Sequence, residues 1–138
     1  FQLVNWNKQQ KLGKVFDSST GFTLPDHSVR SPDASWVSNE KWNSLSTIEK
    51  QKFAPVCPEF VIELKSYNDD IDYLKEKMLK TWIKNGSQLG WLIDPEEQVI
   101  YTYTQDGLQE TLHGFQRQVS AAQVLPNFEL DFTQLEEE

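Results

Sequence analysis

The stretch CPEFVIELKS, residues 57–66, decides how the rest of the chain must fold. Its apolar residues predict a short buried strand, and they are Phe60, Val61, Ile62 and Leu64. Two charged residues, Glu63 and Lys65, interrupt the end of that strand. Because Glu and Lys are seldom fully buried unless they are paired, we expect the end of this strand to have a chemical role.

Short strands and helical segments are predicted before this stretch. A helix is expected to end within residues 1–11, and strands are expected at 14–19, 21–24, 28–30 and 34–38. Residues 18–21 are expected to form the turn between the first two strands. Residues 39–53 are expected to be at least partly helical, and Ser46 is a suitable N-cap because Glu49 follows three residues later.

The clearest helix follows the stretch, over residues 69–85. Its apolar residues recur with helical spacing and form one stripe: Ile71, Leu74, Met78 and Trp82. A strand pair is then expected at 89–94 and 98–103, and weaker strands at 108–113 and 128–132. This order of elements predicts an α/β or α+β fold, with a central mixed β-sheet flanked by helices.

The bulk composition narrows the class of protein. A chain of 138 residues fits one compact domain over 1–138, and no apolar run reaches the roughly 18 residues that a membrane-spanning helix needs. The single cysteine, Cys57, excludes an internal disulfide framework and favours a reducing compartment such as the cytoplasm. The sequence begins without an initiator Met, and no signal peptide is predicted.

The charge of the chain is unevenly distributed. A net charge of −8 argues against a protein that binds nucleic acids over its whole surface. Residues 1–30, however, carry four basic residues against two acidic ones, and the basic ones are Lys8, Lys11, Lys14 and Arg30. A local interaction with nucleic acid is therefore compatible with this sequence.

The carboxylates of Asp33 and Glu63 form the candidate catalytic site. Asp33 begins one predicted strand and Glu63 ends another, so the two meet if these strands are neighbours. Close carboxylates repel each other unless a cation lies between them, and Mg²⁺ takes oxygen ligands while it keeps several waters. The Leu64 carbonyl could complete the protein ligands. Lys65, on the same strand face as Glu63, could position a water for phosphodiester hydrolysis.

Two alternative interpretations of these residues stay open. Such a short pattern arises by chance, and Pro25-Asp26 is a second Pro-Asp pair in the same chain. Glu63 and Lys65 could instead form a solvated pair on a half-exposed strand. A zinc site is not predicted, because His27, His113 and Cys57 lack the spacing of zinc ligands.

The chain resembles the putative restriction endonuclease family of bacteria, within the PD-(D/E)XK nuclease superfamily. The resemblance rests on GKVFDSSTGFTLP, RSPDASWV, KFAPVCPEFVIELKS, KMLKTWIKNGSQLGWLIDP and VLPNFELDF, which together span most of the chain. It implies a restriction endonuclease-like sandwich in which Asp33, rather than Asp26, and Glu63 bind Mg²⁺ or Mn²⁺. The Lys65 position varies in this family, so the helix residue Lys77 is kept as an alternative lysine.

The resemblance also implies a substrate and an assembly. The expected substrate is DNA, and a cut through both strands would require two sites, hence a homodimer. Relatives usually have additional N-terminal sequence, so we expect the domain over 1–138 to lack its extreme N-terminal segment. The alternative function is that of a catalytically decayed nuclease fold that serves as a binding or dimerisation module.

Overall fold

A mixed six-stranded sheet forms the centre of the molecule. The computed structural model describes residues 2–135, so residue 1 and the acidic residues 136–138 lie outside the description. The strand order is β1-β4-β5-β6-β7-β8. In that order the strands span Gly13–Asp17, Ala34–Ser38, Phe60–Leu64, Leu89–Asp94, Val99–Thr104 and Gly107–His113. Only β5 and β6 run parallel, and the other neighbours in this sheet are antiparallel. The predicted fold class, a mixed sheet flanked by helices, is confirmed.

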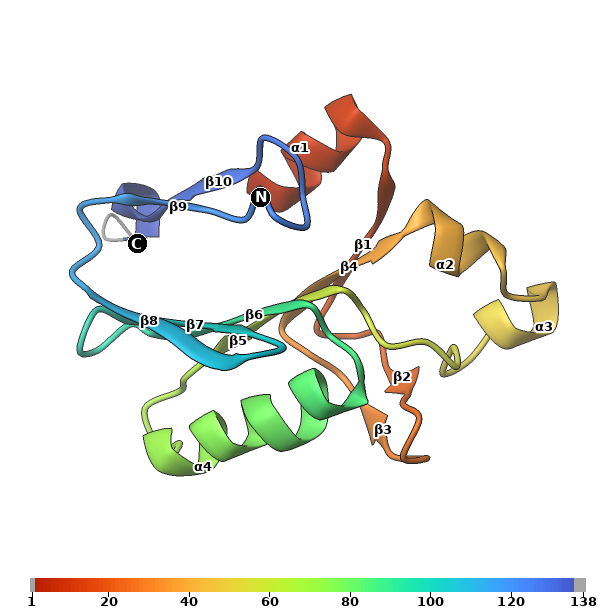
Figure 1. Cartoon of the computed structure of the whole chain (residues 1–138), viewed down its shortest axis with the longest axis horizontal. Helices are drawn as coiled ribbons and strands as arrows, with labels where there is room; N and C mark the ends of the chain where they lie inside the picture. Colours follow the sequence, from red (N-terminus) through yellow and green to blue (C-terminus); the bar gives the residue numbers. More distant parts are fainter. Residues whose placement is uncertain (1, 136–138) are drawn as a thin grey trace.

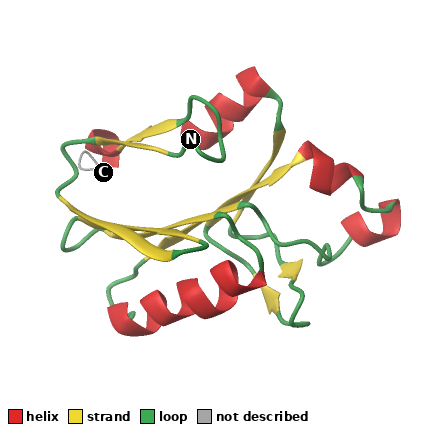
Figure 2. Ribbon diagram, in the orientation of Figure 1, coloured by secondary structure: helices red, strands yellow, loops and turns green. Residues whose placement is uncertain are grey.

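Helices cover both faces of the sheet (Figures 1 and 2). Helix α1 (Gln2–Gln10) lies over one face, beside the short pair β9 (Gln118–Ser120) and β10 (Glu129–Asp131) and the 3₁₀ turn η2 (Phe132–Leu135). Helix α4 (Ile71–Lys77), continued by the π-helical segment η1 (Met78–Ile83), lies over the other face. Helices α2 (Asn39–Asn43) and α3 (Thr47–Lys50) extend to one side, near the two-stranded β2 (Phe22–Thr23) and β3 (Val29–Arg30). No described helix is long and apolar enough to cross a membrane.

Strand β5 is buried on both faces because its side chains alternate between two cores. Phe60 and Ile62 belong to the cluster under α1, with Trp36 and Trp91. Val61 belongs to the cluster under α4, with Trp82 and Met78 among others. By the same alternation Glu63 follows Val61 on the α4 face, so a carboxylate takes a place where the pattern would put an apolar side chain. These three tryptophans are buried in the core.

The long helix follows its predicted stripe but changes its winding. Met78 and Trp82 are buried, and Ile71 and Leu74 pack against them. The change from α to π winding at Met78 has no counterpart in the hydrophobic pattern. The helix stops at Asn85-Gly86, where Gly86 has a φ of +123°, which favours glycine. The Ser46–Glu49 capping box is also confirmed.

The first two predicted strands have other partners than each other, and one strand was not predicted. Residues 18–21 were expected to form the turn between the strands at 14–19 and 21–24, and a turn is present there, with the Thr20 N–H bound to the Asp17 carbonyl at 3.2 Å. The two strands do not pair with each other, because β1 pairs with β4 and β2 pairs with β3. Turn residues predict a change of chain direction, but they do not determine whether the two flanking strands pair with each other or with strands further along the chain. Strand β9 was not predicted because its three residues form no periodic pattern.

Gly13 permits the close contact between β1 and β4. A Cβ atom at this position would lie 2.3 Å from the Val37 carbonyl oxygen and 2.5 Å from the Trp36 ring. Gly13→Ala should lower the free energy of unfolding by about 1–3 kcal/mol, the usual effect of overpacking. Urea denaturation measures this effect, and Lys14→Ala, the exposed neighbour on the same strand, is the control. Equal stability of Gly13→Ala and the wild type would contradict this account.

Candidate active site at the end of strands β4 and β5

Asp33 and Glu63 each accept a hydrogen bond from the backbone of the other's strand segment, where the ladder between β4 and β5 ends. The last paired residues are Ala34 and Ile62, so Asp33 lies opposite Glu63 just beyond the pairing. The Asp33 N–H donates to Glu63 Oε1 at 3.2 Å, and the Leu64 N–H donates to Asp33 Oδ2 at 2.6 Å. Each carboxylate therefore satisfies a backbone donor that the sheet leaves without a strand partner. The predicted proximity of the two carboxylates is observed.

The Glu63 carboxylate is buried, and each of its oxygens has a partner in the protein. Glu63 is only 6% exposed, and its Oε2 atom accepts a hydrogen bond from Trp82 Nε1 at 3.2 Å. The Lys77 ammonium group lies 2.7 Å from the same oxygen. A buried carboxylate needs such partners because desolvation penalises its charge. Trp82 was expected only as a core residue, and no sequence signal shows that its indole N–H reaches Glu63.

The lysine that contacts Glu63 comes from the helix and not from the strand. Lys65 Nζ lies 3.2 Å from Glu96 Oε1, in the turn after β6, and donates to the Ser66 carbonyl at 3.3 Å. The expectation that Lys65 points toward Asp33 with Glu63 therefore does not match these contacts. Strand β5 ends at Leu64, so the alternation of side chains between the two faces of the sheet no longer determines the direction of the Lys65 side chain. Lys77, the alternative lysine, lies beside the carboxylates.

A polar pocket of about 250 Å³ opens at these residues. Its lining combines the proposed site with the start of α4: Ser31, Asp33, Glu63, Leu64, Ser66, Asp69, Tyr73, Leu74 and Lys77. Asp69 lies at the pocket, and its Oδ2 atom accepts a hydrogen bond from the Ser66 N–H. Lys65 is not part of this lining.

The donor atoms of the pocket fit a hard divalent cation. Asp33 is half-buried, and its Oδ1 atom accepts no hydrogen bond from the residues that the structure describes. Mg²⁺ is commonly held by one or two carboxylates and keeps several waters, which matches Asp33 and Glu63 beside a polar opening. Within residues 2–135 no group of three or more His, Cys, Asp or Glu side chains could hold a metal ion. The fit therefore rests on two carboxylates and carbonyl or water oxygens.

The second Pro-Asp pair has a different environment. Asp26 accepts hydrogen bonds from the Ser28 hydroxyl and N–H and from Asn85 Nδ2. The Ser28 bonds are the main reason why its pKa falls to about 2. Asp26 thus stabilises a surface turn. Burial raises the pKa of the Cys57 thiol, which disfavours the reactive thiolate.

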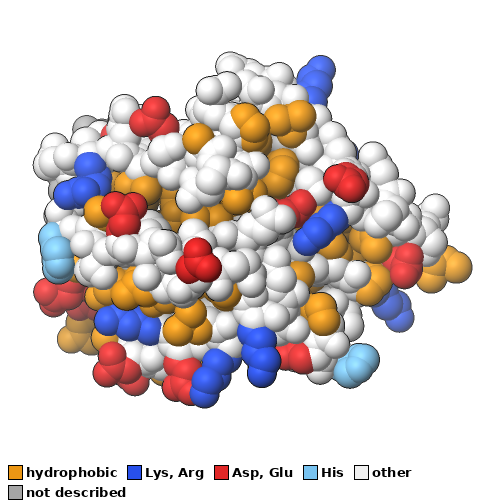
Figure 3. Space-filling view, in the orientation of Figure 1, with side chains coloured by type: hydrophobic (Ala, Val, Ile, Leu, Met, Phe, Trp, Pro, Cys, Tyr) orange, Lys and Arg blue, Asp and Glu red, His pale blue; other side chains and the backbone are white. Residues whose placement is uncertain are grey.

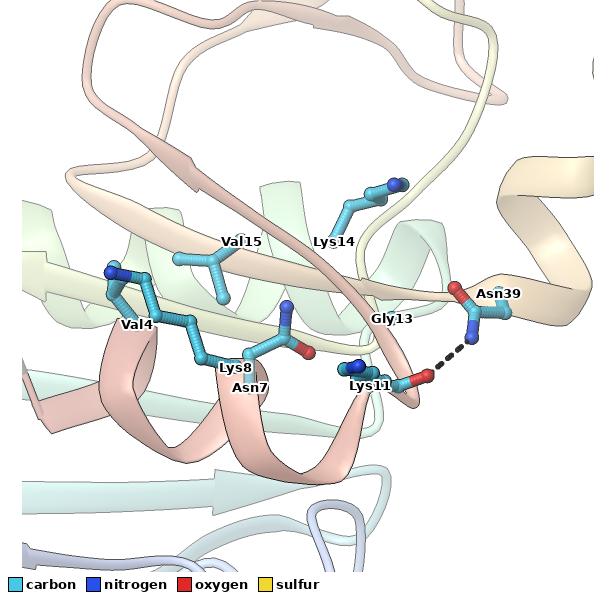
Figure 4. Close-up of a pocket in the computed structure, with 8 residues that line it drawn as sticks. All are labelled: Val4, Asn7, Lys8, Lys11, Gly13, Lys14, Val15 and Asn39. Atoms are coloured by element: carbon cyan, nitrogen blue, oxygen red, sulfur yellow. Dashed lines mark hydrogen bonds between the residues drawn. The ribbon is translucent and has the colours of Figure 1, made fainter.

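A separate basic pocket lies between α1, β1 and the start of α2 (Figure 4). Lys8, Lys11 and Lys14 line it, with no carboxylate in the lining, and Asn39 Nδ2 donates to the Lys11 carbonyl at 2.8 Å. These lysines account for much of the basic character of the N-terminal region. Elsewhere acidic and basic side chains are interspersed, as along the border over α4 (Figure 3). The negative net charge is therefore not a uniform surface property.

Comparison with known proteins agrees with this architecture. A crystal structure of "a putative nuclease belonging to DUF820" from Anabaena variabilis ATCC 29413 superposes with a TM-score of 0.77 at 24% identity. That match covers 99% of this chain and 74% of the other, and it shows the shared fold. A cryo-EM structure of the DrdV–DNA complex is less similar, with a TM-score of 0.49, 12% identity, and coverage of 80% and 9% of the two chains. No curated protein matches the chain significantly.

The family follows from the sequence as a whole. A family model described as "Putative restriction endonuclease" matches residues 1–133, which include both strands of the carboxylate pair and the helix that bears Lys77. The chain belongs to this family, Uma2.

Proposed function

We propose that this chain is a metal-dependent endonuclease that hydrolyses DNA phosphodiester bonds. The observation that carries the proposal is the meeting of Asp33, Glu63 and Lys77 at one polar pocket, although they come from two strands and a helix. Two carboxylates beside a lysine supply the charges that phosphodiester hydrolysis uses, and the family description favours DNA as substrate. Cleavage of both strands would require two sites, so we expect a homodimer, acting in the cytoplasm.

Each residue has a proposed role. Asp33 and Glu63 would hold Mg²⁺ or Mn²⁺, with the Leu64 carbonyl as a further ligand. When bound, the ion would polarise the phosphate and lower the pKa of its water. Lys77 would orient the attacking water and balance the Glu63 charge, while Trp82 fixes the carboxylate in place. Lys65, with its contact to Glu96, would have a secondary role.

The surface of the chain provides an approach for an anionic substrate. The three lysines of the basic pocket form no ion pair with any described residue. Lys14 pairs with Val37, toward the end of β4 that lies away from Asp33. The four residue steps from Asp33 to Val37 span about 13 Å along the strand. The pocket lies beside α1, over the other face of the sheet from Glu63 and α4, so we expect it to contact DNA only where the strand passes around the edge at β1.

The two Pro-Asp pairs give a direct test of the metal site. Asp33→Asn should abolish Mn²⁺ binding, because it removes one of two carboxylate ligands. Asp26→Asn should leave metal binding unchanged, since its carboxylate belongs to a hydrogen-bonded turn. Calorimetric titration of the full chain measures both. An equal loss in the two variants would show that the metal lies elsewhere.

The two lysines can be separated by kinetics. Lys77→Ala should lower the single-turnover cleavage rate by roughly 10²–10⁴-fold, the usual effect of one acid–base group. Lys65→Ala should have a much smaller effect, because its ammonium group contacts Glu96 outside the pocket. The Mn²⁺ affinity of each variant, measured in parallel, distinguishes a slower cleavage step from a loss of metal binding. Wild-type cleavage by Lys77→Ala would remove this lysine from the mechanism.

Stability in chelator tests the Glu63–Lys77 ion pair itself. The Lys77 side chain is 27% exposed, so solvent screens the pair only in part. Glu63→Gln and Lys77→Met should each lower the free energy of unfolding by about 1–3 kcal/mol, because each leaves a partly buried charge without its partner. The double variant should lose less than the sum of the two. Additive losses in urea denaturation would mean that the two charges do not interact.

A further inference from the structure

An aromatic and basic pocket lies next to the candidate active site. It has a volume of about 620 Å³, and its lining includes Phe16, Trp42, Phe53, Lys50 and Lys52. Phe53 is 56% exposed, which is unusual for a phenylalanine. Lys50 Nζ lies 5.7 Å from the centre of the Trp42 ring, and Phe16 packs against the same ring at 5.1 Å. The pocket therefore presents aromatic rings and ammonium groups together.

The backbone of Phe53 is held in place while its ring stays open to solvent. Thr23 Oγ1 donates to the Phe53 carbonyl at 2.8 Å, and the Thr23 N–H donates to the next carbonyl, that of Ala54, at 2.9 Å. One side of the ring rests on Gly21, where an added Cβ would come within 2.9 Å of Phe53 Cδ1. A ring supported on one side and exposed on the other is a stacking platform.

Gly21 connects this pocket to the carboxylates. The same added Cβ would lie 3.2 Å from Ser31 Oγ, and Ser31 lines the pocket of Asp33 and Glu63. Ser31 precedes Asp33 by only two residues, so their Cα atoms are at most about 7 Å apart. The two pockets are thus neighbours, connected through Gly21 and Ser31.

The charges of the pocket favour an anion. Neither Lys50 nor Lys52 forms an ion pair with any residue between 2 and 135. Two carboxylates directly follow or precede residues of the pocket in the sequence, and both form hydrogen bonds within their own segments. Asp17 accepts two hydrogen bonds from Ser19, and Glu49 closes the capping box of α3. Aromatic rings beside unpaired cations are the features by which proteins bind single-stranded nucleic acid.

We infer that this pocket binds an unpaired nucleotide next to the phosphate that is cleaved. Its base would stack on the Phe53 ring and its phosphate would contact Lys50 and Lys52. A base within a continuous duplex offers no free face to such a ring, so the inference assigns a substrate class: nucleic acid with an unpaired nucleotide beside the cut. This inference rests on the proposed function for the position of the cut, and on the pocket alone for the binding.

Binding in chelator, where no cleavage is expected, tests the pocket separately from the chemistry. The probe is a single-stranded DNA oligonucleotide with 2-aminopurine, whose fluorescence drops when its base stacks. Phe53→Ala should raise the Kd by roughly 5- to 150-fold, which corresponds to the loss of one base stacked on an aromatic ring. Phe53→Trp should keep the wild-type affinity, and Phe53→Leu, which retains an apolar side chain, should not. Leu108→Ala, another exposed apolar residue but on the far edge strand β8, is the control.

Salt dependence tests the lysines. Changing both Lys50 and Lys52 to Gln should make the slope of log K against log salt shallower by about 1.4, since each contact to a single strand contributes about 0.7. A blunt duplex of the same sequence should bind more weakly and should not respond to Phe53→Ala.

Three results would overturn the inference. The first is that Phe53→Ala binds the oligonucleotide with wild-type affinity. The second is that Phe53→Ala weakens the binding of single-stranded and duplex DNA equally. The third is that Phe53→Ala changes the molecular mass of the protein assembly and leaves the oligonucleotide affinity unchanged. The last result would mean that a second copy covers the ring. Asp33→Asn separates the two proposals, since it should lose cleavage and retain oligonucleotide binding. If wild-type protein with Mn²⁺ cleaves nothing while binding still depends on Phe53, the nuclease proposal fails and the stacking pocket stands.

Discussion

The buried carboxylate of Glu63 is the constraint on which the site depends. A charge at 6% exposure must be compensated by donors close by, and three segments provide them. The loop before β4 provides the Asp33 N–H, η1 provides the Trp82 indole N–H, and α4 provides the Lys77 ammonium group. Glu63 therefore holds two strands and a helix in one relative position. Asp33 lines the same polar pocket, and one of its carboxylate oxygens has no hydrogen-bond partner among the described residues.

The parallel pairing of β5 with β6 makes this arrangement possible. Parallel neighbours need a crossover, and here the chain crosses through α4 and η1 before it returns as β6. The helix is thereby laid across one face of the sheet, as Figure 1 shows, and its residues Lys77 and Trp82 contact Glu63 there. Its buried stripe anchors it to the core through Met78 and Trp82, so that Lys77, just before Met78, lies at the rim with the carboxylate. The same packing that stabilises the fold positions the charges for the proposed chemistry.

The distribution of charge over the surface explains how an acidic chain could bind the proposed anionic substrate, DNA. The net charge of −8 opposes general association with DNA, yet lysines without ion-pair partners among the described residues gather in two pockets, one at α1 and the start of β1 and one beside Phe16 and Trp42. Repulsion over most of the surface together with local attraction would favour substrates that fit the pockets over nucleic acid in general. The aromatic rings near one lysine pair add a requirement for an unstacked base.

The sequence by itself determined the buried strand at residues 60–64, the apolar stripe of the long helix and the β6–β7 pair, because periodicity and turn residues are local properties. It placed Asp33 and Glu63 at the ends of two strands, and the pairing of β4 with β5 in the tertiary structure brought them together. It also carried the family resemblance that the comparison confirmed. Only the tertiary structure decided which lysine contacts Glu63. The alternation of side chains along a strand predicts the face on which a residue lies, but it does not predict the direction of a side chain beyond the end of the strand. The platform at Phe53 was likewise hidden, because it forms where residues 21, 31 and 53 meet, and such long-range contacts leave no periodic signal in the chain.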